Sequence, residues 1–183
     1  FGVRQRLELG KKGQSADVLV MTATPIPRSL ALAQYGDMDV SVLDEKPAGR
    51  QPIKTALISD ERVSEVINHL RDAISQGRQA YWVCPLVGES EVSDLIAAEE
   101  RFKTLRALLG EDVIRLVHGQ MPAAEKDAAM SDFVEGRAQV LVATTVIEVG
   151  VNVPKATIMV IERAESFGLA QLHQLRGRVG RGS

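Results

Sequence analysis

After residue 52, short apolar runs alternate with longer segments whose apolar residues recur at helical spacing. The apolar runs lie at residues 53–58, 79–87, 113–117, 140–143 and 157–161. The helical patterns lie at residues 61–76, 95–109, 122–134 and 169–175. Strands that alternate with helices form βαβ units, in which parallel strands share one sheet and helices cover both of its faces. The alternation therefore predicts an α/β fold with five parallel strands.

The apolar residues of the patterns also predict which side chains form the core. The run at 79–87 is nearly continuous, which is typical of a strand that is buried on both faces. The helical stripes are expected to face the sheet, and they comprise Val63, Val66, Ile67, Leu70 and Ile74, then Leu95, Ala98, Phe102, Leu105 and Leu109. The chain of 183 residues holds one Trp, two Tyr and four Phe, so this core is mainly aliphatic.

A linker is expected at residues 44–52, where two prolines, one glycine and four charged residues follow one another. Before it, apolar runs at residues 17–21 and 40–43 predict two further short strands. The composition changes most sharply at this linker. We therefore expect a domain boundary here, with residues 1–49 on one side and residues 50–183 on the other.

Charge and cysteine content exclude several classes of protein. The net charge of −2 does not indicate a nucleic-acid partner, so any phosphate-binding surface must be a local cluster of basic residues. Cys84 is the single cysteine, which excludes a disulfide framework and a zinc motif and is typical of a small buried core residue in a cytoplasmic protein. No apolar run reaches the roughly 18 residues of a membrane span. We expect no resident metal site and no membrane partner.

The last residues of the chain gather arginine and glycine around Gln174, Gly177, Arg178 and Arg181. Arginine suits phosphate because its planar guanidinium offers several donors and stays charged. Arg178 and Arg181 are three residues apart, so on a helical turn they would share a face. A short motif of this kind is equally typical of an arginine-rich surface turn.

Polar residues follow several of the expected strands, where ligands of parallel sheets bind. They are Thr22, Ala23 and Thr24, then His118 and Gly119, then Thr144 and Thr145. Threonine hydroxyls at such ends suit contacts to nucleic-acid phosphates, but threonine is also an ordinary strand residue. His118 is equally explained as a capping or core residue. The chain has no Gly-x-x-x-x-Gly-Lys-Ser/Thr sequence, so by itself it cannot hold nucleotide phosphates in the P-loop manner.

Four segments in this order and spacing carry a resemblance, at residues 22–28, 117–121, 143–154 and 168–182. Together they resemble the superfamily 2 helicases, and among them the RecG family of bacterial DNA helicases, with the Mfd family as a near relative. The resemblance covers essentially the whole chain. It implies a RecA-like fold, of the type found in P-loop NTPases.

The resemblance also implies roles for the first of these residues. Thr22, Ala23 and Thr24 match helicase motif III, which couples the nucleotide state to DNA. His118 and Gly119 are expected to contact DNA in the same way as Thr144 and Thr145.

For the nucleotide, the resemblance implies that Gly150 and Asn152 of motif V contribute to binding, although many relatives carry aspartate where this chain has Asn152. In motif VI, Gly177 is likewise implied to contribute to nucleotide binding. Gln174, Arg178 and Arg181 are implied as catalytic residues, and the two arginines would reach the γ-phosphate as arginine fingers.

The family arrangement implies that the P-loop and the acidic motif that holds Mg²⁺ precede Phe1. Residues 1–49 would then be the tail of the first RecA-like domain, and residues 50–183 most of the second. We expect this piece to be inactive alone and to use ATP with Mg²⁺ bound mainly by the first helicase domain. A wedge domain for branched DNA would belong to the same full-length chain.

The function expected on this basis is ATP-dependent remodelling of branched DNA, such as stalled forks and Holliday junctions, in recombination and repair. Two alternatives remain open. One is an Mfd-like translocase on duplex DNA that couples transcription to repair. The other is a non-catalytic α/β binding module whose arginines only decorate the surface.

Overall fold

The computed structural model describes residues 52–86, 90–144 and 153–180, together with residues 21, 41, 43 and 50. The chain divides into two compact units, Phe1–Ser41 and Val42–Ser183. Almost all described residues belong to the second unit. The helices and strands that the described residues form, from Asp60 to Arg176, all lie in this unit. The expected domain boundary after residue 49 stays a prediction.

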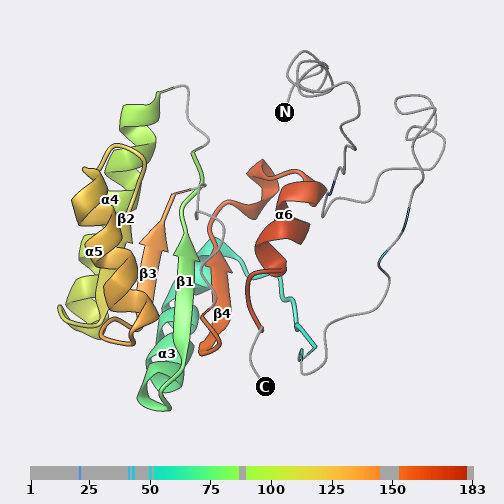
Figure 1. The fold of residues 1–183 in the computed structure, drawn as a ribbon, viewed down its shortest axis with the longest axis horizontal. Coiled ribbons are helices and arrows are strands. Elements are labelled where there is room, and N and C mark those ends of the chain that lie inside the picture. The colour runs from blue at the N-terminus through green and yellow to red at the C-terminus, as the bar shows by residue number, and fades with distance from the viewer. Residues whose placement is uncertain are drawn as a thin grey trace, which may run out of the picture. The chain divides into compact units, whose positions relative to one another are not determined.

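The described part of the second unit contains one sheet of four parallel strands (Figure 1). The strands are β1 (Gln79–Val83), β2 (Ile114–Val117), β3 (Val140–Ala143) and β4 (Ala156–Ile161). Their order across the sheet is β2-β3-β1-β4, so β1 and β3 are central. The predicted α/β fold with parallel strands is confirmed.

Helices connect the strands as the sequence pattern predicts. They are the 3-10 helix η1 (Asp60–Arg62), α3 (Val63–Ser75), α4 (Glu91–Leu109), α5 (Ala123–Val134), the 3-10 helix η2 (Ala164–Ser166) and α6 (Leu169–Arg176). Ser59 caps η1, because its hydroxyl accepts a hydrogen bond from the backbone N–H of Glu61. Helix α4 begins four residues earlier than expected, within the acidic segment that precedes the predicted helix.

Alternate residues of the central strands enter two separate apolar clusters, one on each face of the sheet. Ala80 and Trp82 of β1 join a cluster that contains residues of α3 and α4. Tyr81 and Val83 join the opposite cluster, which contains Phe133 of α5 and Val179 from the turn after α6. Except for Leu95, the residues of the predicted helical stripes lie in the first cluster or pack against it. All five residues of β1 are buried, as its continuous apolar run predicted.

One expected strand is wrong. Residues 53–58 form neither helix nor strand, and Leu57 is 94% exposed. Only Ile53 packs against the core. A run of strand-forming residues becomes a strand only when its backbone pairs with a neighbour, and such propensity is a weak guide on its own.

The two strands expected before the linker fall mainly outside the described residues. Met21, Ser41 and Leu43 are described, and none of them lies in a helix or strand. Met21 and Leu43 are exposed. The remaining residues of these two runs are not described, so the strands stay predictions.

Gln79 is a buried polar residue at the first position of β1 that the sequence pattern did not single out. Its amide nitrogen donates to the carbonyl oxygens of Phe133 at 2.6 Å and Ala138 at 2.8 Å. These carbonyls lie at the end of α5 and just before β3. The side chain therefore joins the start of the central strand to the crossover that leads into β3.

We predict that Gln79→Leu lowers the free energy of unfolding by about 1–3 kcal/mol, because it removes the side-chain donor to the buried carbonyl of Ala138 and one of the donors to the carbonyl of Phe133. Gln139→Leu is the matched control, since that amide donates to Gly136 at the exposed surface. It should change stability by less than about 0.5 kcal/mol. Urea unfolding followed by the fluorescence of Trp82, the only tryptophan, measures both. Equal losses in the two variants would contradict the assigned role of Gln79.

Candidate functional site

The carboxyl ends of the four strands place one residue each along a single edge of the sheet. The residues are His118 after β2, Thr144 after β3, Cys84 after β1 and Glu162 after β4. Backbone pairing continues past the strands and fixes these positions. The N–H of Thr144 donates to Val117, that of Cys84 donates to Ala143, and that of Glu162 donates to Val83.

His118 and Thr144 are neighbours on this edge, because Val117 and Ala143 are partners in the β2–β3 register. His118 is half-buried, and within the described residues its Nδ1 is buried without a hydrogen-bond partner. Gly119 is exposed and has open space where a side chain would project. Thr144 is only 4% exposed, so packing accounts for it and a role in DNA contact stays a prediction.

A second group on the same edge connects two strands to α4. The Sγ of Cys84 donates to Oε2 of Glu162 at 3.2 Å. A guanidinium nitrogen of Arg101 in α4 lies 2.6 Å from Oε1 of Glu162, and the Arg101 guanidinium carbon lies 5.6 Å from the centre of the Trp82 ring. Arg101 thus bridges a carboxylate and an aromatic face. Sequence reasoning gave no signal for Arg101.

The environment of Cys84 makes its thiol a poor nucleophile. Burial raises the pKa of this thiol far above its usual range, and the negative charge of Glu162 raises it further. The buried position predicted for Cys84 is confirmed. The thiol therefore serves as a hydrogen-bond donor within the fold.

The arginine-rich turn, which follows α6 and contains Arg178, does not lie at the carboxyl ends of the strands. Helix α6 ends at Arg176, so Arg178 lies in the turn that follows the helix. Because Arg181 lies outside the described residues, a shared face for the two arginines stays a prediction. The chain then returns to the other end of β4, because the N–H of Gly180 donates to the carbonyl of Ala156, the first residue of that strand. The structure therefore brings His118 and Thr144 together but separates them from the arginine turn.

Arg178 itself is half-buried. Within the described part of the chain, no ion pair or side-chain hydrogen bond engages its guanidinium. Val179, next to it, is buried in the core cluster that contains Tyr81 and Phe133. The turn is thus anchored by an apolar side chain, and the guanidinium next to it has no anionic partner among the described residues.

Most of the other expected site residues lie outside the described residues. They are Thr22, Ala23, Thr24, Thr145, Gly150, Asn152 and Arg181. Gln174 lies in α6, and Gly177 follows its last residue.

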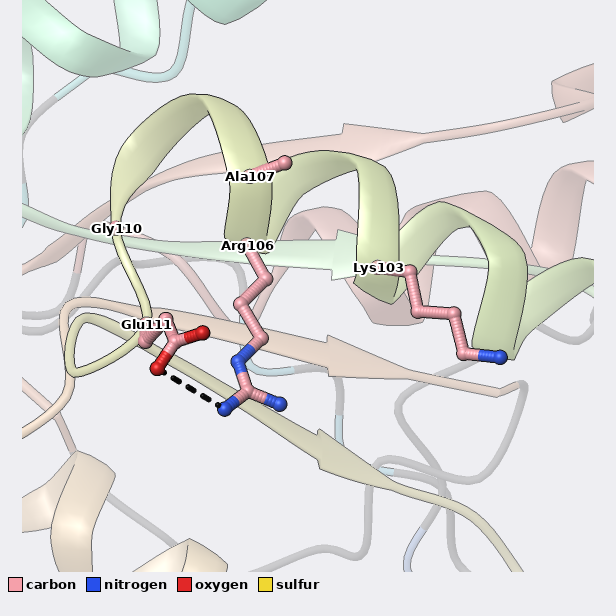
Figure 2. A pocket seen from close by; sticks show the side chains of 5 residues that line it. All are labelled: Lys103, Arg106, Ala107, Gly110 and Glu111. Atoms are coloured by element: carbon pink, nitrogen blue, oxygen red, sulfur yellow. Dashed lines mark ion pairs between the residues drawn. The ribbon is translucent and has the colours of Figure 1, made fainter.

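A shallow hollow at the carboxyl end of α4 is a poor candidate for a functional site (Figure 2). Its lining includes Lys103, Arg106 and Glu111, and Arg106 pairs with Glu111 at 3.4 Å. Helix α4 follows β1 and precedes β2, so its last turn lies at the amino ends of the strands. The hollow is therefore remote from the edge that carries His118 and Thr144.

Neither a metal cluster nor a membrane-spanning helix is found among the described residues. No group of three or more His, Cys, Asp or Glu side chains lies close enough to hold a metal ion in this part of the chain. Within the same residues, no helix has the length and apolar character needed to cross a membrane.

Comparison with known proteins decides the family. Residues 61–183 match the model of the helicase conserved C-terminal domain. The chain belongs to this helicase family. The match covers α3 to α6 and thus both the carboxyl edge and the arginine turn.

The relatives of this helicase domain carry one name. Over its whole length, the chain is 54% identical to the ATP-dependent DNA helicase RecG of Escherichia coli (strain K12) and 52% identical to RecG of Thermotoga maritima. It spans 27% and 24% of those proteins, about a quarter of their length. The resemblance to RecG that the motifs predicted is confirmed.

Solved structures agree with the helicase assignment. A structure of RecG bound to a three-way DNA junction matches 93% of this chain with a TM-score of 0.74 and 51% identity, and the match covers 22% of that RecG chain. The helicase Lhr of Mycobacterium smegmatis, solved with single-stranded DNA and AMP-PNP, matches with a TM-score of 0.51 and 17% identity. The Lhr likeness shows the shared fold alone.

We predict that Cys84 reacts with iodoacetamide at pH 8 far more slowly than a free cysteine, because its raised pKa leaves little thiolate. Glu162→Gln should speed the reaction, since it removes the charge that raises this pKa. Glu165→Gln, which changes an exposed carboxylate in the neighbouring 3-10 helix, should not. Mass spectrometry gives the rates. Reaction of the native chain as fast as the urea-unfolded chain would contradict the assignment.

Proposed function

We propose that this chain is part of an ATP-dependent DNA helicase of the RecG type. The full-length protein would remodel branched DNA, such as stalled forks and Holliday junctions, in recombination and repair. Support comes from identity above 50% to RecG along the whole chain, and from a RecG structure that holds a three-way junction. Because this piece lacks a P-loop sequence, we expect it to be inactive alone.

The observation that carries the nucleotide role is the state of Arg178. Its guanidinium has no anionic partner among the described residues, while its neighbour Val179 fixes the turn in the core. An arginine held in this way can meet charge that develops on a transferred phosphoryl group. Burial of Arg178 in ion pairs within the domain would have favoured the non-catalytic alternative, and the described residues show no such ion pair.

In this proposal Arg178 and Arg181 act as arginine fingers, and Gln174 lies with them at the reacting end of the nucleotide. Gly150, Asn152 and Gly177 contribute to nucleotide binding. ATP with Mg²⁺ would be held mainly by the first helicase domain of the full-length chain, and the metal would neutralise charge on the phosphates. This domain adds the donors that face the nucleotide from the other side.

DNA contacts belong to the carboxyl edge of the sheet in the same proposal. His118, Gly119, Thr144 and Thr145 would contact the DNA backbone, and Thr22, Ala23 and Thr24 would couple that contact to the nucleotide. Support comes from the exposed position of Gly119 and the open space beside it at this edge. The arginine turn lies beside the amino end of β4, so nucleotide and DNA would meet different surfaces.

We predict that Arg178→Ala or Arg181→Ala in the full-length protein lowers the kcat of DNA-stimulated ATP hydrolysis by about 100-fold or more, because a charge-stabilising donor is lost. DNA affinity should change by less than about threefold, since a phosphate contact to DNA is not involved. Arg78→Ala, which changes an exposed arginine between α3 and β1, is the control. Coupled-enzyme turnover and fluorescence anisotropy with a forked DNA measure the two effects. Equal losses in turnover and DNA affinity would assign these arginines to DNA instead.

We predict that His118→Ala weakens binding of forked DNA by the full-length protein about fivefold, the loss expected for one hydrogen bond of about 1 kcal/mol. His69→Ala is the matched control, because His69 is exposed on α3 away from the strand ends. Anisotropy titrations without nucleotide report the affinities. An unchanged affinity for His118→Ala would remove this residue from the DNA surface.

A further inference from the structure

Two arginines join the segment before the first helix to the end of α6. The Nη2 of Arg50 donates to the carbonyl oxygen of Gly177 at 3.1 Å, in a partly buried contact between residues 127 positions apart. The Nη2 of Arg176 donates in return to the carbonyl oxygen of Ile53 at 2.9 Å. Each segment thus supplies one guanidinium donor and one carbonyl acceptor. We call this pair of contacts the arginine clasp.

Both sides of the arginine clasp are anchored in the same apolar cluster. Ile53 packs against this cluster, and Val179 is a buried member of it. The Arg50 contact also falls at a favourable place in α6. The last carbonyls of a helix lack partners within it and carry partial negative charge, so a cation there both fills a hydrogen bond and complements the helix dipole.

Space around Gly177 is limited. A methyl group added at its Cα would lie 3.3 Å from the carbonyl oxygen of Gln174 and 3.8 Å from the Arg50 guanidinium. The backbone at this position is therefore enclosed on two sides. The direction in which the chain leaves α6 toward Arg178 is set by the clasp and by the helix end together.

We propose, building on the function proposed above, that Arg50 is a positioning residue for Arg178. It does not contact the nucleotide. By holding the carbonyl of Gly177, one residue before Arg178, it fixes the turn that presents the Arg178 guanidinium. A misplacement of about 1 Å at a reacting centre is enough to lower a rate strongly.

The test uses the full-length protein, with ATP hydrolysis measured at saturating forked DNA. Arg50→Ala should lower kcat about tenfold and leave both the KM for ATP and the affinity for DNA within about twofold. Arg50→Lys should recover most of the activity, because an ammonium group still donates to a carbonyl. Arg62→Ala is the control, since Arg62 pairs with Glu65 at the exposed surface. It should match the native protein.

A double-mutant cycle separates positioning from a general loss of structure. If Arg50 acts through Arg178, Arg50→Ala should have little further effect when Arg178 is already alanine. A full tenfold loss in that background would overturn the proposal. So would native kcat in Arg50→Ala while Arg178→Ala is strongly impaired. Native turnover in Arg178→Ala would instead remove the proposed nucleotide function, and the positioning role with it.

Discussion

The central strand β1 pairs through its backbone with a strand on each side, and all five of its residues are buried. A strand in this position must have apolar side chains on both faces, and each face must be covered. Because all the strands are parallel, each connection has to cross over the sheet, which places helices on the two faces. The same pairing aligns the strand ends. The edge that carries His118 and Thr144 therefore follows from how β1 pairs with β3 and how β3 in turn pairs with β2.

Much of this arrangement could be predicted because it depends on local periodicity. The apolar stripe from Val63 to Ile74 predicts which face of that helix is buried. The continuous apolar run in β1 predicts burial on both faces of that strand. The segment 53–58 has the composition of a strand, yet the described structure gives it no strand partner, and composition alone could not reveal that. The motifs at the carboxyl edge and at Arg178 were recognisable by residue type and spacing.

Long-range contacts were beyond prediction from the sequence. Nothing in the pattern around Arg50 indicates a carbonyl 127 residues away. The bridge that Arg101 makes between Glu162 and Trp82 depends on the packing of α4, and the amide bonds of Gln79 depend on where α5 ends. Each is a polar contact between groups that lie far apart in the sequence. Such contacts follow from the assembled fold rather than from any one segment.

The two candidate surfaces lie at opposite ends of the strands. In the proposed function, residues at the strand ends would contact DNA, while the turn after α6, which lies beside the start of β4, would present a cation to the nucleotide. The core cluster that contains Val179 also contains Tyr81 and Val83 of β1. The sheet thus lies between the proposed DNA surface and the proposed nucleotide surface.

The central claim is that Arg178 meets the nucleotide and not the DNA. A structure of the full-length protein with forked DNA, Mg²⁺ and an ADP–metal fluoride that mimics the transferred phosphoryl group tests it most directly. We expect the Arg178 guanidinium within hydrogen-bond distance of the fluoride group, with the DNA on the His118 edge. An Arg178 guanidinium bound to a DNA phosphate, or one that contacts neither ligand, would contradict this claim.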